Sequence, residues 1–290
     1  MRLSSLIWSI TVLAVAVLGS LVPLAYTLYL SFISPGGEVG TLTLKNFASV
    51  ISDVNFYRST FLSIAYTLLS LMGSLVIGVA AALVLSALGR SNRILEGLYA
   101  MPLAVSPIIA GILWSPPAVW DDINSLLHVS FGLPFIDVTD AIIYFPIMTL
   151  AESWLWSPLF MLASLIVIED IPKECVGAAR LMGANEFDLL RYLYLPSILR
   201  SNVVRTLMII KSIDFFRAFE IPFAWSNWVR ATQVGEATDT LSLLLFKQLV
   251  YPPSGLPSIQ YIATVSMLLL GVSLSVAFVL FRVFVQGERS

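Results

Sequence analysis

Six long apolar runs divide the chain. They cover residues 6–32, 60–88, 95–114, 142–168, 203–225 and 261–284. Each is about as long as, or longer than, the roughly 20 apolar residues that cross a bilayer as a helix. Inside hydrocarbon the backbone has no water to bond, so runs of this kind are helical. The pattern predicts an all-α polytopic membrane protein with six transmembrane helices, built as a single domain over residues 1–290.

Lysine and arginine residues predict the orientation of these helices. With the N-terminus inside, ten of them fall on the inner side: Arg2, Arg90, Arg93, Lys173, Arg180, Arg191, Arg200, Arg205, Arg282 and Arg289. The outer side holds Lys45, Arg58, Arg230 and Lys247. Because cytoplasmic loops are enriched in these residues, we expect both termini in the cytoplasm of a multi-pass cell-membrane protein. Residues 169–202 then form a cytoplasmic segment.

Composition supports the membrane assignment and narrows the chemistry. Of the 290 residues, 58% are hydrophobic and 12% are charged, whereas about a quarter are charged in soluble domains. A net charge of −2 gives no basic field for nucleic acid. One cysteine, Cys175, and one histidine, His128, are too few for a disulfide framework or a His/Cys metal cluster. We therefore expect no metal site, no bound cofactor and no catalytic residue in this chain.

The cytoplasmic segment contains the stretch IPKECVGAARLMGANEFDLLRYLYLP, residues 171–196. Its first half places apolar residues at helical spacing, and Gly183 can end that helix. Asn185 can cap a second helix with Asp188 in a capping-box position, and Pro196 is expected to terminate or kink it. Two short amphipathic helices joined by a glycine turn are predicted. Such a unit either lies in the lipid headgroup region or docks a soluble partner.

The same stretch resembles the EAA loop of the permease subunits of binding-protein-dependent ABC importers. The residues in register are Ile171, Pro172, Ala178, Ala179, Gly183, Ala184, Leu195 and Pro196. Two further stretches, NFASVISD (46–53) and ATDTLSLLLFKQLV (237–250), are similar to the sugar-transporting subgroup. Six spans and the position of the loop agree with that family.

The resemblance implies a type I ABC importer permease that forms half of a translocation pathway for a mono- or oligosaccharide and works by alternating access. It implies a second, related but distinct permease, two cytosolic ATPases that bind ATP and Mg, and an extracytoplasmic solute-binding protein. A G-x-x-x-x-G-K-[ST] phosphate loop is absent from this sequence, in keeping with an ATP site on a partner. Candidate ATPase-coupling residues are Glu174, Gly177, Ala178, Ala179, Arg180, Gly183, Ala184 and Pro196.

The loop departs from the family pattern at two positions. The glutamate of the EAA motif is Gly177 here, and the aspartate before the glycine is Met182. Glycine inside a helix costs about 1 kcal/mol relative to alanine, so Gly177 indicates either a close approach or a relaxed requirement. Glu174 or Arg180 could supply the missing polar contact.

Charged residues recur within the fifth apolar run. Lys211, Asp214, Arg217 and Glu220 follow one another at every third position with alternating sign. One interpretation is a ladder of neighbouring ion pairs that keeps the charges tolerable inside a bundle. The other places Asp214 or Arg217 beside a solute path, with Phe215, Phe216 and Phe219 as stacking surfaces. Pro222 is expected to break the helix beyond this row.

The fourth apolar run carries Glu152, beside Trp154 and Trp156. A carboxylate within a membrane is costly unless it is paired or wetted, so Glu152 is predicted to line a solute path or to pair with Lys211. The candidate pathway residues are therefore Glu152, Trp154, Asp214, Arg217, Phe219 and Glu220.

Other functions remain open at this stage. A permease of the same family could carry glycerol phosphate, a polyamine or a peptide. A secondary transporter could use the intramembrane charges as an ion relay, although inverted repeats typical of such proteins are not visible. A membrane-embedded enzyme is disfavoured by the scarcity of His and Cys and by the lack of a G-x-S-x-G motif.

Overall fold

The computed structural model describes residues 3–34, 41–88, 93–115, 120–132, 134, 141–228, 239–252 and 258–286. Within these ranges all regular secondary structure is helical, apart from an isolated bridge between Ile33 and Leu42, so the all-α prediction is confirmed. The helices are α1 (Leu3–Ser31), α2 (Lys45–Ile51), α3 (Val54–Leu88), α4 (Arg93–Ala100), η1 (Met101–Ala104), α5 (Pro107–Trp114), α6 (Trp120–Phe131), α7 (Ala141–Asp170), α8 (Lys173–Leu181), α9 (Glu186–Leu189), η2 (Leu190–Tyr194), α10 (Leu195–Arg200), α11 (Asn202–Phe216), α12 (Glu220–Trp228), α13 (Leu241–Val250) and α14 (Ile259–Gln286).

Four helices among the described residues are long and apolar enough to cross a membrane: α1, α3, α7 and α14. Two of the six predicted spans are not single straight helices. The run 95–114 folds as α4–η1 followed by α5, with a bend of 94° between them. The run 203–225 folds as α11 and α12, separated by a break at residues 217–219. The six predicted spans are thus not confirmed; the described residues hold four, or five if the bent pair counts as one.

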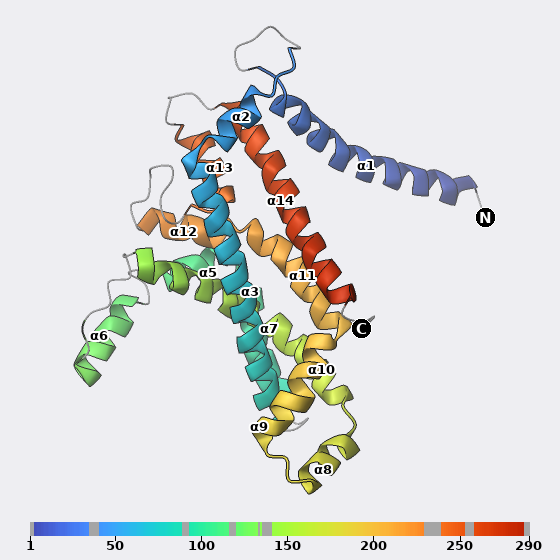
Figure 1. Cartoon of the computed structure of the whole chain (residues 1–290), viewed down its shortest axis with the longest axis vertical. Helices are drawn as coiled ribbons and strands as arrows, with labels where there is room; N and C mark the ends of the chain where they lie inside the picture. The colour runs from blue at the N-terminus through green and yellow to red at the C-terminus, as the bar shows by residue number, and fades with distance from the viewer. Residues whose placement is uncertain are drawn as a thin grey trace.

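The long helices α3 and α7 lie side by side and form the centre of the molecule (Figure 1). Glycines on α3 allow the close approach. A Cβ atom at Gly73 would lie 2.2 Å from the Oγ of Ser153, and one at Gly78 would lie 2.6 Å from the Cβ of Phe160. Small residues at such positions bring helix backbones together, which strengthens packing where the hydrophobic effect is weak.

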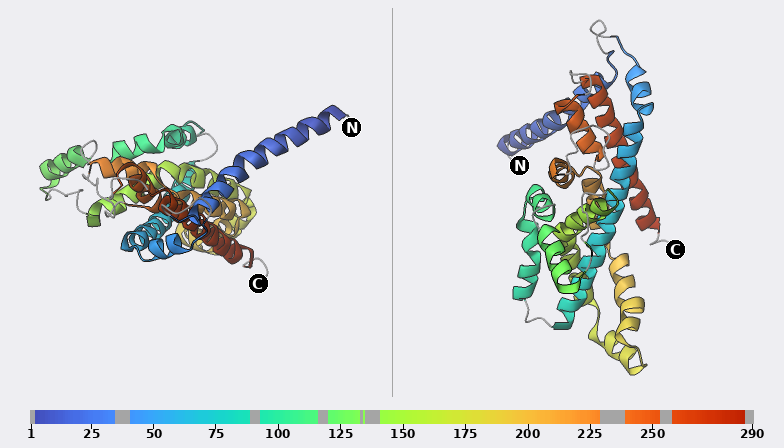
Figure 2. Two further views of the ribbon diagram at one scale, coloured as in Figure 1. Left: turned by 90° about the horizontal axis from the view of Figure 1, so that it is seen from above. Right: turned by 90° about the vertical axis from the view of Figure 1, so that its left-hand side faces the viewer.

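Helix α1 leaves the body at an angle, and its N-terminal end lies far from the other helices (Figures 1 and 2). The C-terminal end of α1 is held by Asn46 of α2. The Nδ2 of Asn46 donates to the carbonyl oxygens of Ser31 and Ile33 at 2.9 and 2.8 Å. Asp53, just before α3, accepts a hydrogen bond from Tyr261 of α14. The stretch 46–53 therefore joins the first, second and last long helices.

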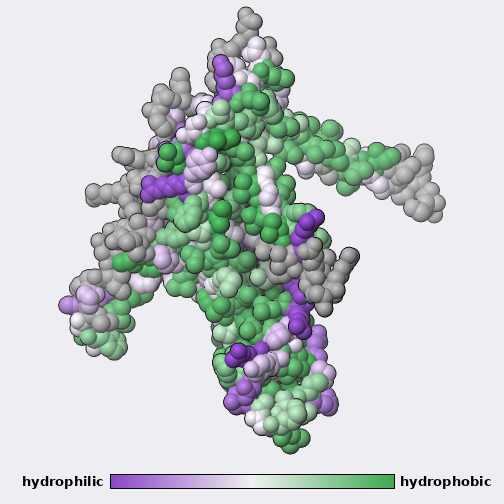
Figure 3. Space-filling model, in the orientation of Figure 1, coloured by the Kyte–Doolittle hydropathy of each residue, from purple (hydrophilic) through white to green (hydrophobic). Residues whose placement is uncertain are grey.

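Helices α8–α10 project from the end of the molecule opposite to α2 (Figure 1). Figure 3 shows hydrophobic side chains over the middle of the body and hydrophilic ones gathered over this projecting end. The distribution is that of a body embedded in lipid with a segment extending into water. The orientation of the termini stays a prediction.

Candidate functional site

The interruption between α11 and α12 is the first feature of the site. Helix α11 ends at Phe216, and α12 begins at Glu220 with Pro222 in its first turn. In a continuous helix the Pro222 ring would clash with the carbonyl of Ala218, four residues earlier, and Pro222 has no N–H to bond it. The proline-linked break therefore lies within the charged row, before Glu220, and not beyond that row as expected.

The carbonyl groups freed by this break are bonded by hydroxyl groups at the start of α13. Thr240 Oγ1 donates to the carbonyl oxygen of Ala218 at 2.9 Å. Ser242 Oγ donates to that of Arg217 at 3.0 Å. Side-chain hydroxyls commonly satisfy backbone groups at helix breaks in membrane proteins. The sequence indicated a proline-linked break but gave no sign that residues more than 20 positions away would stabilise it.

The row of charges runs from the interior to the surface. Lys211 Nζ lies 2.7 Å from Asp214 Oδ2; the Lys211 side chain is 7% exposed and that of Asp214 is 43% exposed. Arg217, the first residue of the break, and Glu220, the first residue of α12, are exposed. The ion pair between the first two members is as the ladder interpretation predicts. The other two are displayed on the surface at the interrupted backbone.

Glu152 is buried in α7 and is held by two aromatic donors. Its Oε2 accepts from Tyr66 Oη at 2.8 Å, and its Oε1 accepts from Trp156 Nε1 at 2.7 Å. The Nζ of Lys211 lies over the ring of that same tryptophan, 2.9 Å from its centroid. The close ion pair of Lys211 is with Asp214 rather than with Glu152, so the alternative of a Glu152–Lys211 pair was wrong; both groups contact Trp156. Tyr66, on α3, was missed by sequence reasoning, since an isolated tyrosine in an apolar run carries no such signal.

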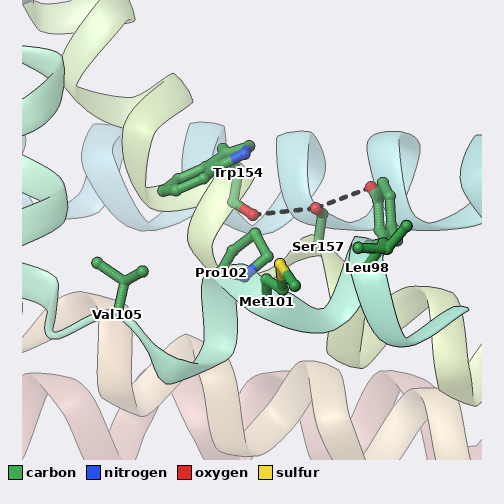
Figure 4. Close-up of a pocket in the computed structure, with 7 residues that line it drawn as sticks. Leu98, Met101, Pro102, Val105, Trp154 and Ser157 are labelled. Atoms are coloured by element: carbon green, nitrogen blue, oxygen red, sulfur yellow. Dashed lines mark hydrogen bonds between the residues drawn. The ribbon is translucent and has the colours of Figure 1, made fainter. Parts of the chain in front are cut away.

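Trp154 lies apart from the charged row. Its ring centroid is 5.8 Å from that of Trp114 in α5. It borders a cavity of about 310 Å³ between α7 and the α4–η1 segment, where Tyr99 Oη and Ser157 Oγ are 3.0 Å apart (Figure 4). The lining residues are Leu98, Tyr99, Met101, Pro102, Val105, Trp154 and Ser157. The structure therefore does not bring Trp154 together with the other candidate pathway residues.

Phe219 sits in the break and packs in an aromatic cluster. Its ring centroid is 5.2 Å from those of Phe223 in α12 and Phe246 in α13. Asp214, Arg217, Phe219 and Glu220 all lie at or next to the bend. The buried Glu152 is connected to Asp214 through Trp156 and Lys211.

Lys247, counted above among the outer-loop charges, is buried in α13. Its Nζ lies 2.6 Å from Oδ1 of Asp239, which is also buried. A buried ion pair needs good geometry and further hydrogen bonds to be tolerated. This pair was not predicted, because a lysine in a stretch flanked by loops looks like a surface residue.

The projecting segment has the predicted turn. Gly183 has φ of +94° and follows α8. Asn185 Oδ1 accepts from the backbone N–H of Asp188 at 2.9 Å, and Asp188 Oδ2 accepts from that of Asn185 at 3.0 Å. The capping box is therefore confirmed. Across the turn, Arg180 and Glu186 form an exposed ion pair at 2.7 Å.

The remaining coupling candidates lie on the exposed side of this segment. Glu174, Gly177 and Ala178 are exposed, whereas Ala179 and Ala184 are half-buried. A Cβ atom at Gly177 would have no neighbour within 4 Å, so no close approach within this chain requires the glycine. Pro196 is the second residue of α10, which directly follows the π-helical turn η2. The chain stays helical through it, so Pro196 does not terminate the segment.

A groove of about 730 Å³ separates α8 from the ends of α3, α4 and α7. Gly177 and Arg180 lie on its rim, with Glu96 and Glu169 on the opposite side. At the tip of the segment, Leu181 is 91% exposed and Met182 is 82% exposed. An apolar tip beside a charged groove is suited to contact with another protein.

Comparison with known proteins gives a consistent result. No model of a protein family matches the chain. The trehalose/maltose transport system permease protein MalF of Thermococcus litoralis is 27% identical over 208 residues, 70% of this chain and 68% of that protein. The trehalose transport system permease protein SugA of Mycobacterium tuberculosis is 23% identical over 267 residues, 90% of this chain and 82% of that protein.

Among solved structures, a bacterial ABC transporter involved in the import of the acidic polysaccharide alginate has a similar fold. The TM-score is 0.74 at 16% identity, with 97% of this chain and 95% of that chain covered. The likeness of fold therefore extends over nearly the whole of both chains.

Proposed function

We propose that this chain, which belongs to the permease subunits of binding-protein-dependent ABC importers, forms half of a translocation pathway for a mono- or oligosaccharide. It is a multi-pass membrane protein and a transport component rather than an enzyme. The pathway opens alternately to the two sides of the membrane, driven by ATPases that bind the projecting segment.

The observation that carries this proposal is the exposed charge at the α11–α12 break. Asp214 at the end of α11, Arg217 in the break and Glu220 at the start of α12 are half or fully exposed. Charges facing hydrocarbon are costly, and irregular backbone at membrane depth is tolerated only beside protein or a water-filled cavity. This face of the chain is therefore turned toward a wet path or a second subunit.

The residues of the bend suit a carbohydrate. Carboxylates and a guanidinium offer acceptors and donors for sugar hydroxyls, and the aromatic cluster that contains Phe219 lies on the same bend. Pathway residues of this kind bind through a few well-placed polar groups beside an apolar surface. The names of the two relatives above, which are sugar permeases, support the same class.

The projecting segment is the docking element for a cytosolic ATPase. Its helix–turn–helix shape is fixed by the Gly183 turn, the Asn185–Asp188 capping box and the Arg180–Glu186 ion pair. Glu174, Ala178, Ala179 and Ala184 share this surface, and ATP with Mg is bound by the partner. Pro196 lies where the segment returns toward α11.

Two further partners complete the importer. A second, homologous permease covers the charged face of the bend and forms the other half of the path. An extracytoplasmic binding protein delivers the sugar to the outer end of the molecule. Both partners are expected from the family. The second permease is also expected on physical grounds, because the exposed charges at the bend must be shielded from lipid.

Reconstitution into liposomes tests the proposal. The chain is assembled with its cognate second permease, ATPase and binding protein, and uptake of radiolabelled trehalose, maltose and glucose is measured. We expect uptake that requires ATP and all components. Uptake by the purified chain without any ATPase would contradict the importer assignment. Uptake of glycerol phosphate, a polyamine or a peptide, with none of the sugars transported, would contradict the solute class.

A further inference from the structure

The start of α13 contacts the α11–α12 bend through Thr240 and Ser242. It carries none of the exposed charges of the bend, which are Asp214, Arg217 and Glu220. We propose that Thr240 and Ser242 are positioning residues, which hold the backbone of the bend and thereby set where Arg217 and Glu220 are displayed. The inference rests on the proposed function in one respect only: the bend is taken to border the solute path.

The proline in α12 creates the need for Thr240. Pro222 has no N–H to offer the carbonyl of Ala218. That carbonyl lies in a buried residue, where an unbonded oxygen is costly. Thr240 Oγ1, itself buried, fills the position at 2.9 Å. The threonine hydroxyl thus replaces the missing amide hydrogen of the proline.

Ser242 acts on the adjacent residue. Its Oγ donates to the carbonyl of Arg217 at 3.0 Å, at the point where α11 ends. Two consecutive carbonyls of the bend are therefore bonded to residues two positions apart on α13. This pair of bonds fixes both the position and the direction of the backbone that carries the Arg217 side chain.

The α13 turn is itself anchored to the centre of the molecule. The backbone N–H of Leu241 donates to Ser63 Oγ of α3 at 2.8 Å. The buried ion pair of Asp239 and Lys247, at 2.6 Å, connects the residue before Thr240 to the second half of α13. Because α3 packs tightly on α7, the hydroxyls of Thr240 and Ser242 are presented from a rigid support.

An aromatic contact strengthens the same connection. Phe246, one turn further along α13, packs against Phe219 of the break and Phe223 of α12 with ring centroids 5.2 Å apart in each case. The bend is thus held through its backbone by hydroxyl groups and through a side chain by an aromatic ring. α13 and the bend are expected to move as one body during transport.

Chemical labelling of a cysteine at the bend tests this role without knowledge of the solute. The native Cys175 is replaced by serine, Glu220→Cys is introduced, and labelling by a membrane-impermeant maleimide is followed in vesicles that contain the assembled transporter. Loss of one hydrogen bond changes a conformational equilibrium by about two- to tenfold, so Thr240→Val is expected to change the labelling rate by that factor. Thr240→Ser, which keeps the hydroxyl, is expected to restore the original rate.

The exposed Cys175 of α8 is the matched control, labelled in detergent without the ATPase in a chain that lacks Glu220→Cys. Its labelling rate is expected to stay the same when Thr240→Val is introduced. An equal change at both cysteines, or no change at the cysteine introduced in the bend, would overturn the proposal. If Thr240→Val prevents assembly, Ser242→Ala is measured in its place, because it removes a single bond to an exposed residue.

A double-mutant cycle with Pro222→Ala isolates the hydrogen bond. Alanine at 222 supplies an N–H that can bond the Ala218 carbonyl, so Thr240→Val is expected to have a smaller effect in the Pro222→Ala chain than in the natural one. Effects of the two substitutions that simply multiply would overturn the link between them. Sugar uptake by vesicles that contain the chain with its natural Glu220, with and without Thr240→Val, separates the two hypotheses. Altered labelling without transport of any sugar would contradict the proposed solute and support the positioning role.

Discussion

The Nζ of Lys211 lies over the ring of Trp156, 2.9 Å from its centroid, while the Nε1 of that ring donates to Glu152. One indole therefore contacts a buried cation through its face and a buried carboxylate through its edge. Both contacts match the charge distribution of an aromatic ring, which is negative on the face and positive at the edge. The arrangement connects α7 with α11 in the interior without a direct ion pair.

Removal of the Trp156 edge contact should destabilise the protein. Trp156→Phe keeps an aromatic face for Lys211 but leaves Glu152 with one donor fewer, and a hydrogen bond to a charged group contributes about 1.5–3 kcal/mol. Trp156→Leu removes both contacts and should cost more. Thermal unfolding of the purified chain in detergent measures both. The exposed Trp8 of α1 provides the control, and equal effects of Trp8→Leu and Trp156→Leu would contradict this account.

The second donor to Glu152 gives a separate prediction. Tyr66→Phe deletes one hydroxyl and leaves a buried carboxylate oxygen without it, at a cost of about 1–3 kcal/mol. Tyr57→Phe, an exposed position on the same helix, should have little effect. Adding Glu152→Gln to Tyr66→Phe should recover part of the loss, because the amide carries no charge. A Tyr66→Phe chain that unfolds at the same temperature as the natural one would refute the role of this hydroxyl.

Two glycines of the projecting segment should respond differently to alanine. Gly183 has φ of +94°, a conformation that costs an L-residue about 1–2 kcal/mol, so Gly183→Ala should weaken binding of the ATPase measured by co-purification. Gly177→Ala meets open space and adds helix propensity, so it should leave binding unchanged or slightly improved. The bulkier Ala179→Trp should abolish binding while membrane insertion remains intact. Unchanged ATPase binding by both Gly183→Ala and Ala179→Trp would argue against the docking role.

Close packing between α3 and α7 can be tested at Gly78. Its Cβ in an alanine variant would lie 2.6 Å from the Cβ of Phe160 and from the carbonyl oxygen of Ser157. Overpacking of this kind costs about 1–3 kcal/mol, so Gly78→Ala should lower the unfolding temperature. Gly19→Ala in α1, where no atom lies within 4 Å, serves as the matched substitution. A drop of the same size for Gly19→Ala would show that the effect is not one of packing.

Local signals were predicted well from sequence. The turn at Gly183 and the capping box of Asn185 and Asp188 depend on residues within three positions of one another, so the sequence contains all the information needed. The apolar runs likewise identified α1, α3, α7 and α14 as spans. These features are set by backbone conformation and by hydrophobicity over short windows.

Bends and long-range partners were not predictable in the same way. An apolar run has the same composition whether it forms one straight helix or two at 94°, as residues 93–114 do. The partner of Glu152, Tyr66, lies 86 residues earlier, and the hydroxyl that bonds Ala218 lies 22 residues later. Only packing of the whole chain brings these groups together. The position of the α11–α12 break could have been inferred, because a proline disturbs the residue four positions before it.

Helix α1 has a thermodynamic consequence for the molecule. Each of the three buried apolar clusters is formed by residues outside α1, and the most apolar part of α1 buries nothing in the described structure. Since contacts that do not exist cannot contribute to cooperativity, the N-terminal part of α1 adds almost nothing to the free energy that holds the body together, whereas its C-terminal end contacts α2 and α14. A chain lacking the first half of α1 should unfold in the same transition as the full chain. The body and the N-terminal part of the first helix are in this sense thermodynamically independent.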